Sequence, residues 1–320
     1  MLCPMSLLRL RTSSAVLLTL ATLSLPIAAQ TPTVFPPPLI QGGATVQLGR
    51  HTWVIPDQEV TLVPNVGIVV GRTATLVIDT GMGSRNARTI LAEVARISRN
   101  ARLIVVVTHT HPEHISGLAA FPAGTVFIAA KAQHPEIAGL MERGFGGMAR
   151  LSPFIGELLQ DAGVRQPDRQ FDRVQTLDLG GVRVRLEWLG PSAHSPGDTI
   201  AVVEGDGVIF AGDLAPKDRF PSFSPSSTRA GYLAAFSRLE ALKPRVMVPS
   251  HGPTSTLAVL SEQRTMLEAM RSRVQALKTA GTTLEATTRT ITTEFTGRYP
   301  AWRNTVPNEI APIVTALYAE

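Results

Sequence analysis

The sequence predicts an α/β fold in which two β-sheets pack face to face and helices cover their outer sides. Strand-like and helical segments alternate along the chain in two strand-rich halves, each with its own helices. The chain has 320 residues and is 44% hydrophobic, so it can bury a large core in one main domain. We expect the second half to resemble the first in its elements.

In the first half, short β-branched and apolar runs flank a helical segment. Residues 103–107 form an unbroken apolar run, typical of a strand covered on both faces. Gly71-Arg72 joins two earlier runs, as in a hairpin. Apolar side chains recur at helical spacing within residues 84–99. Strands are predicted from near Val46 and for residues 60–70, 73–79, 103–107 and 125–130, and helices for residues 84–99 and from Pro135.

The second half repeats this pattern. Gly180-Gly181 and Gly205-Asp206-Gly207 are turn signals between strand-like runs. Strands are predicted within residues 174–189 and for residues 200–203, 208–211 and 246–249, and a helix for residues 231–242. Residues 257–320 are predicted to form a C-terminal helical extension packed on the two sheets. The sequence leaves open whether this extension only packs, joins a homodimer interface or shapes the rim of a pocket.

The N-terminus is predicted to be a secretory signal peptide over residues 1–29. Arg9 and Arg11 precede an apolar stretch, and Ala28-Ala29 offers small residues at a cleavage point. The stretch is shorter than the roughly 20 residues that a membrane span needs, which argues against a stable anchor. A proline-rich lead-in over residues 30–45 follows. We therefore expect a periplasmic or secreted protein.

The composition argues against disulfides, thiolate metal ligands and a nucleic-acid partner in the mature chain. Cys3, the one cysteine, lies in the predicted signal peptide, so we expect no disulfide and no thiolate ligand. Cleavage would remove Arg9 and Arg11 and lower the net charge from +5 to +3, with charges interspersed. This balance is too mild to predict a nucleic-acid partner.

Five of the seven histidines lie in a pattern that predicts a metal site. Three of them occur within six residues, in the segment Thr-His-Thr-His-Pro-Glu-His that directly follows the run 103–107. Two more lie in His-Ser-Pro-Gly-Asp and Ser-His-Gly, and a Gly-Asp pair lies between them. Imidazole and carboxylate are the ligands expected of zinc and similar metals. The candidate ligands are His109, His111, Glu113, His114, His194, Asp213 and His251.

The order of these motifs resembles the metallo-β-lactamase superfamily of hydrolases, over residues 46–253. The resemblance implies an αββα sandwich for residues 46–256, with two mixed β-sheets. It also implies that His109, His111 and His194 hold one zinc ion and that Glu113, His114 and His251 hold a second. Asp213 would bridge the two ions. Asp79, in Ile-Asp-Thr-Gly after a strand, resembles the family's aspartate that braces the metal loop through hydrogen bonds.

By this resemblance the two ions stabilise a hydroxide that attacks a carbonyl or phosphoryl centre. Glu113 and Asp213 would thus serve as catalytic residues as well as ligands, and Asp198 would secure the loop of His194. Glu113 departs from the family pattern, which has aspartate at that position. Its longer side chain could still bind the second ion, or turn to a neighbouring group and leave that site weak, empty or selective for another metal.

The predicted function is an exported zinc hydrolase of a small ester, lactone, thioester or lactam. One exported β-lactamase branch uses a cysteine ligand, which this chain lacks, so β-lactamase activity is one option among these. An iron-dependent oxidoreductase of the same fold and a binding protein with a degenerate site are the alternatives. We expect a small-molecule substrate, with pocket walls from residues 144–148 and 220–224. Lys217 and Arg219 either meet a substrate anion or are solvated loop charges.

Overall fold

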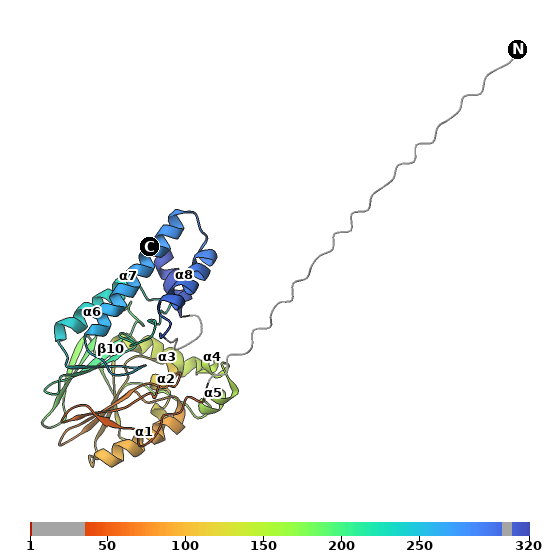
Figure 1. Ribbon diagram of the computed structural model, residues 1–320. Coiled ribbons are helices and arrows are strands. Elements are labelled where there is room, and N and C mark those ends of the chain that lie inside the picture. Colours follow the sequence, from red (N-terminus) through yellow and green to blue (C-terminus); the bar gives the residue numbers. More distant parts are fainter. Residues whose placement is uncertain (2–35, 303–308) are drawn as a thin grey trace. The chain divides into compact units, whose positions relative to one another are not determined.

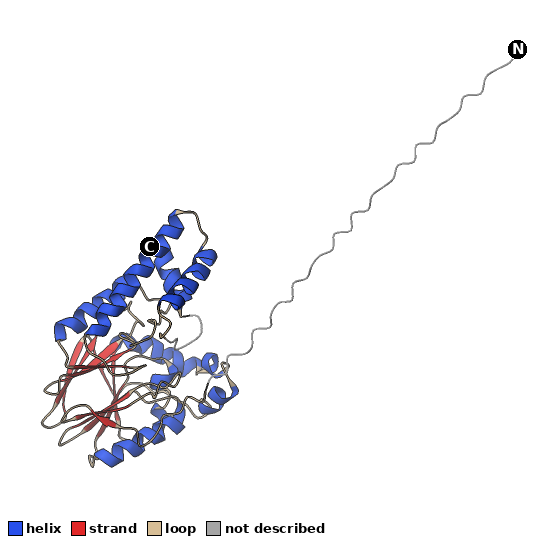
Figure 2. Cartoon of the chain, in the orientation of Figure 1, coloured by secondary structure: helices blue, strands red, loops and turns tan. Residues whose placement is uncertain are grey.

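A computed structural model describes Met1 and residues 36–302 and 309–320, so the predicted signal peptide, apart from Met1, lies outside the described residues. The described residues from 36 onward belong to one compact unit. Two mixed sheets lie back to back between layers of helices, as Figure 2 shows. This confirms the predicted fold, including the helical C-terminal extension. None of the helices in the described residues is both long and apolar enough to span a membrane.

The first sheet has seven strands in sequence order, antiparallel through β4 and parallel from β4 to β7. Its strands are β1 (Val46–Gln47), β2 (Thr52–Ile55), β3 (Val66–Val70), β4 (Thr75–Ile78), β5 (Leu103–Val106), β6 (Val126–Ala130) and β7 (Arg169–Phe171). The predicted strand 60–70 is therefore wrong for residues 60–65. Leu62 there has a positive φ of 62°, and the backbone groups of Val63 and Asn65 bond to the segment around His251.

The second sheet has five strands in the order β12-β11-β10-β9-β8, antiparallel except for the β11–β12 pair. Its strands are β8 (Val174–Asp178), β9 (Arg183–Trp188), β10 (Thr199–Val203), β11 (Val208–Gly212) and β12 (Val246–Pro249). The inner faces of both sheets share one buried core, in which Leu76 and Val106 of the first sheet join Leu186 and Phe210 of the second. Burial of this apolar surface holds the sheets together.

Helices cover both outer faces (Figure 1). The outer core of the first sheet includes Ile90 and Val94 of α1 (Gly83–Ile97) and Ile137 of α3 (His134–Arg143). Three short helices complete this side: α2 (Pro112–Ile115), α4 (Gly146–Ala149) and α5 (Pro153–Leu158). Single 3-10 turns span Leu118–Ala120 and Lys131–Gln133.

The outer face of the second sheet is covered by α6 and the C-terminal extension. These helices are α6 (Arg229–Leu242), α7 (Ala258–Thr279), α8 (Leu284–Arg298) and α9 (Ile310–Ala319). Met266 and Met270 of α7, Ile291 of α8 and Ile313 of α9 are buried in the same core as Ile209 of β11. The extension is thus continuous with the core of the second sheet.

Candidate metal centre

The candidate ligands gather at one edge of the sandwich because each lies next to a strand end. His109, His111 and His114 follow β5, Asp213 follows β11 and His251 follows β12. His194 precedes β10, whose start lies beside the end of the antiparallel β11. Across this edge, Thr199 N donates to the carbonyl oxygen of Thr108 (2.8 Å), which joins the two sheets where the ligands meet.

A first cluster consists of His109, His111, His194 and Asp213, whose candidate ligand atoms all lie within 4.8 Å of one another. The Nε2 atom of His194 is 3.2 Å from His109 Nε2 and 3.3 Å from His111 Nδ1. It is also 3.5 Å from Oδ2 of Asp213. Three imidazole nitrogens and one carboxylate oxygen therefore point toward a common space.

A second cluster consists of Glu113, His114 and His251. Oδ1 of Asp213 lies 3.8 Å from Nε2 of both His114 and His251. Glu113 Oε1 is 3.9 Å from His114 Nε2. The two carboxylate oxygens of Asp213 thus face different clusters, so this side chain lies between them.

Several buried atoms in the second cluster, and the Asp213 oxygen that faces it, have no hydrogen-bond partner among the described residues. They are Glu113 Oε2, His114 Nε2, His251 Nε2 and Asp213 Oδ1. Buried polar atoms are nearly always satisfied in folded proteins, and an unsatisfied one costs about 1–3 kcal/mol. All four can donate a lone pair to a cation. The residues present therefore fit a metal ion.

The far side of three imidazole rings is fixed by an acceptor. His194 Nδ1 donates to the carbonyl oxygen of Ser222 (2.8 Å), and His251 Nδ1 donates to that of Val63 (3.0 Å). His114 Nδ1 donates to Oδ2 of Asp79 (2.9 Å). A proton on Nδ1 leaves Nε2 of a neutral ring as a lone pair directed into the clusters, as metal binding requires.

Asp79 braces the loop that carries the first three histidines. In addition to the bond from His114, its Oδ1 accepts from the backbone N of Thr108 (2.7 Å). Asp79 has a φ of 69°, a left-handed conformation that aspartate tolerates better than most residues. These bonds are the ones that the sequence resemblance implied for Asp79.

Asp198 organises the loop of His194. Its Oδ2 accepts from the backbone N of His194 (2.7 Å) and of Ser195 (2.9 Å), and its Oδ1 accepts from Ser195 Oγ (2.7 Å). Burial raises the pKa of the Asp198 carboxyl. With these bonds Asp198 fixes the backbone of the His194 loop.

Burial and neighbouring charge set the protonation of the clusters. Burial lowers the pKa of His109 well below its ordinary value and that of His111 to about 3, so both are neutral near pH 7. Burial also acts to lower the pKa of His114, but the Asp79 carboxylate outweighs it and raises that pKa to about 9. Burial acts to raise the pKa of the Asp213 carboxyl, yet the surrounding imidazoles, His251 first, hold it well below its usual range.

Several supporting residues could not be identified from the sequence. Ser222 and Val63 act through backbone carbonyls, which every residue type possesses. Tyr232 Oη donates to the same Ser222 oxygen (2.6 Å), and Gln133 Nε2 donates to the Val107 carbonyl (3.0 Å). Among these residues, only the side-chain amide of Gln133, shortly after the predicted strand 125–130, offered a sequence signal for a supporting role.

Lys217 and Arg219, the two basic residues in the loop after Asp213, lie in different surroundings. Lys217 Nζ pairs with its neighbour Asp218 at 3.0 Å, and both side chains are partly exposed. Arg219 is only 4% exposed and lies 3.8 Å from Asp57. Arg219 is thus not a solvated loop charge. Both side chains line a cavity of about 280 Å³ together with Gly252 and Ala301.

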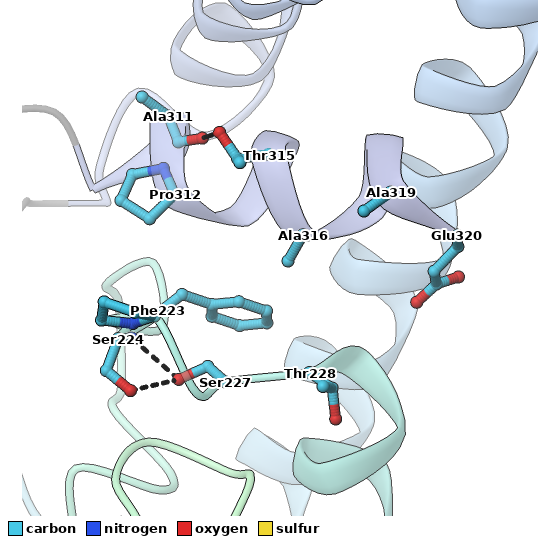
Figure 3. A pocket seen from close by; sticks show the side chains of 11 residues that line it. Phe223, Ser224, Ser227, Thr228, Ala311, Pro312, Thr315, Ala316, Ala319 and Glu320 are labelled. Carbon is cyan, nitrogen blue, oxygen red and sulfur yellow. Dashed lines mark hydrogen bonds between the residues drawn. The ribbon is translucent and has the colours of Figure 1, made fainter.

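Two further cavities lie near the loops that follow Asp213. A small one is lined by Asp213, Pro216, Phe220, Ser222 and His251, so it opens onto the metal clusters. A larger one of about 800 Å³ lies between residues 223–228 and α9 (Figure 3). Its described lining includes none of the seven candidate ligands, so it is separate from the chemistry. Residues 220–224 therefore contribute to both walls.

Comparisons with known proteins agree with this geometry. A family model described as the metallo-beta-lactamase superfamily matches residues 61–251, more than half of the chain. A metallo-beta-lactamase from Pontibacter korlensis superposes with a TM-score of 0.56 at 17% identity, covering 70% of this chain and 98% of that one. A metallo-beta-lactamase family protein from Thermus thermophilus gives a TM-score of 0.60 at 19% identity, covering 83% of this chain and 93% of that one.

A stereoselective inverting sec-alkylsulfatase from Pseudomonas sp. gives a TM-score of 0.66 at 15% identity. The match covers 86% of this chain but 49% of the alkylsulfatase, so the present chain spans about half the length of that protein. Curated proteins yield no match. The structural likenesses show the fold, and the family model, together with the ligand order along four loops, shows that this chain belongs to the metallo-beta-lactamase superfamily.

Proposed function

We propose that the protein is a zinc-dependent hydrolase that binds two zinc ions and acts on a small ester, thioester, lactone or lactam. The position of Asp213 carries this proposal. Its Oδ2 faces His194 at 3.5 Å, and its Oδ1 faces His114 and His251 at 3.8 Å. One carboxylate shared by two donor clusters is suited to a dinuclear hydrolytic site.

The donor set favours zinc among the common metals. It consists of five imidazoles and two carboxylates, ligands that suit borderline dications. The ligands of one ion would be His109, His111 and His194, those of the other Glu113, His114 and His251, with Asp213 between them. Bound zinc supplies a water of lowered pKa and polarises the bond that is attacked.

The residues of the chain orient this chemistry. Asp79, Ser222 and Val63 each hold one imidazole by Nδ1, so that Nε2 stays a ligand lone pair. The buried carboxylate of Asp213 stays ionised and keeps the centre from accumulating excess positive charge. Because the family needs no side-chain nucleophile, the role of Asp79, Ser222 and Val63 is to position the imidazole ligands.

We propose that Glu113 is a ligand despite the additional methylene. Its Oε2 is buried without a partner among the described residues, and its Oε1 lies 3.9 Å from Nε2 of His114. Glu113 follows Pro112 at the start of the short helix α2, which aims its side chain at the second cluster. A carboxylate turned to a neighbouring protein group would instead show a hydrogen bond there.

Metal analysis combined with a hydrolysis screen tests the proposal. The purified chain should contain two zinc ions and hydrolyse at least one of a nitrocefin-like lactam, a lactone, a thioester or a phosphodiester, and chelation should abolish turnover. An alkyl sulfate ester belongs in the screen because of the alkylsulfatase neighbour. Iron as the sole active metal, or metal binding without turnover of any ester or lactam, would contradict the zinc hydrolase.

We further propose that the chain is exported and acts on a small molecule without a nucleic-acid partner. The basic and apolar pattern of residues 1–29 and the interspersed charges support this. Expression in a Gram-negative host followed by cell fractionation should place the protein in the periplasm, with a new N-terminus near residue 30. Retention of the full chain in the cytoplasm would refute export. Light scattering of the purified protein reports whether the extension forms a homodimer.

A further inference from the structure

The backbone around His251 is held by Asn65, the residue directly before β3. Nδ2 of Asn65 donates to the carbonyl oxygens of Pro249 (2.8 Å) and Gly252 (2.7 Å). The backbone N of Asn65 donates to the carbonyl oxygen of Ser250 (2.7 Å). Asn65 therefore bonds to the chain on both sides of His251, and it is itself only 4% exposed.

Asp57 completes the hold on this loop. Its Oδ2 accepts from the backbone N of Gly252 (2.7 Å), and its own backbone N donates to Oδ1 of Asn65 (2.8 Å). Both N–H groups and the oxygen of the Asn65 amide are thereby used. A buried polar network in which every member is satisfied makes its surroundings rigid. Asp57 and Asn65 thus fix the backbone that carries the last imidazole of the metal centre.

The direction of the His251 ring depends on the same segment. Its Nδ1 donates to the carbonyl oxygen of Val63, two residues before Asn65 (3.0 Å). Its Nε2 lies 3.8 Å from Oδ1 of Asp213 and is one of the buried atoms without a partner among the described residues. Because ring and backbone are held from one segment, a change at Asn65 displaces Nε2 relative to the Asp213 carboxylate.

We propose that Asn65, together with Asp57, is a positioning residue that presets His251 for the second metal ion. The inference rests on the proposed dinuclear site and names what sets the affinity for one of its two ions. In the part of the chain that the structure describes, neither side chain bonds to a ligand of the first cluster. The effect should therefore be confined to the second ion.

The alternative is that Asn65 only stabilises the fold, and Asn86 of α1 offers the matched control. The Asn86 amide has the same bonding pattern: its Oδ1 accepts from the backbone N of Ile40 (2.8 Å), and its Nδ2 donates to the carbonyl oxygens of Pro38 (2.8 Å) and Met82 (2.9 Å). It is 1% exposed. Truncation at either asparagine removes comparable bonds, so both variants should lose stability, but only a positioning residue should change metal affinity.

The experiment titrates the metal-free chain with Zn²⁺ by calorimetry and with Co²⁺ by visible absorption, which reports ligand geometry. The ion whose binding is lost in His251→Ala is the second ion. Asn65→Ala is expected to weaken this ion about 10- to 100-fold and to leave the other within about twofold, whereas Asn86→Ala should leave both within about twofold. Unchanged affinity for the second ion in Asn65→Ala, equal weakening of both ions, or the same loss in Asn86→Ala overturns the inference.

Two further measurements keep the inference separable from folding and from hydrolysis. If Asn65→Ala does not fold, Asn65→Ser and Asn86→Ser carry the same comparison. If the wild type binds two ions but hydrolyses nothing, the hydrolase proposal fails and the titrations still decide the role of Asn65.

If the wild type takes up fewer than two ions, nuclear magnetic resonance of the metal-free protein decides. The Nδ1 proton of His251, identified by its loss in His251→Ala, should give a slowly exchanging resonance in the wild type and in Asn86→Ala. This resonance should disappear in the Asn65 variant. Its persistence there would show that the imidazole is held without Asn65 and would overturn the inference.

Discussion

The two donor clusters of the metal centre are built differently. In the first, Nε2 of His194 lies 3.2–3.3 Å from the ring nitrogens of His109 and His111, and burial keeps those two rings neutral. In the second, Glu113 Oε1 lies 3.9 Å from Nε2 of His114, and Asp213 Oδ1 lies 3.8 Å from Nε2 of both His114 and His251. Several of these buried atoms have no hydrogen-bond partner in the part of the chain that the structure describes. The second cluster therefore depends more on a bound cation, because it gathers buried polar atoms that have no hydrogen-bond partner among the described residues.

The largest effect should come from removing the group that both clusters share. Asp213→Ala deletes the carboxylate between them, so we expect loss of at least one metal ion and a fall in kcat/KM of more than about 100-fold. Asp213→Asn keeps the shape and removes the charge, and should fall similarly. Metal content by mass spectrometry and ester hydrolysis measure this. Wild-type zinc content in both variants would mean that the clusters do not share Asp213.

Asp79 acts on the two clusters unequally. Its carboxylate bonds directly to the imidazole of His114 and reaches His109 only through Thr108, whose backbone N can also donate to an asparagine oxygen. Asp79→Asn retains a residue that tolerates a positive φ, and it removes the negative charge behind His114. We expect the affinity of the second zinc to fall about 10- to 100-fold while the first is unchanged. Calorimetric titration of the metal-free protein resolves the two sites. Equal weakening of both would contradict the assignment.

The pH dependence of the metal-free protein should show opposite limbs for the two clusters. The pKa of His111 is lowered to about 3 and that of His109 is also lowered, so both bind protons only on unfolding, and stability falls as pH drops below about 6.5. The pKa of His114 is raised to about 9, so its contribution is complete below about 6.5 and is lost as pH rises toward 9.

The slope of the upper limb is at most about 1.4 kcal/mol per pH unit for one group. Urea denaturation of chelated protein between pH 5 and 9 measures both limbs, and His114→Asn should remove the upper one. In zinc-loaded protein this limb should vanish, because a metal ion takes the place of the proton on Nε2. A metal-free protein that gains stability steadily from pH 6.5 to 9 would contradict the protonated His114.

The smallest effect concerns Glu113 in the absence of metal. Glu113→Gln removes a carboxylate that lies 3.9 Å from the protonated His114, so the chelated protein should lose about 1–3 kcal/mol in the free energy of unfolding near pH 7. The zinc-loaded variant should instead lose affinity at the second site. Glu113→Asp is the matched control, since it keeps the charge on a shorter arm. A chelated Glu113→Gln protein more stable than wild type would show that His114 does not compensate the charge of this carboxylate.

The grouping of the candidate ligands was predictable because five of the seven histidines lie in motifs next to strand-like runs. The carbonyl groups that orient the rings were not, because Ser222 and Val63 carry no distinguishing side-chain signal for that role. The apolar content of residues 60–65 predicts a strand, but the backbone groups of Val63 and Asn65 instead bond to the loop of His251. The burial of Arg219 depends on Asp57, which lies far earlier in the chain, and pattern alone does not connect such distant residues.

The candidate ligands come from both sheets. The four from 109 to 114 follow a strand of the first sheet, and the other three, His194, Asp213 and His251, lie next to strands of the second. A ribosome-bound chain that ends before His251 therefore lacks the last imidazole, and no ion can be fully enclosed until the sandwich has closed. Metal acquisition would then be a late step, and a bound ion would stabilise the closed sandwich against separation of its two halves.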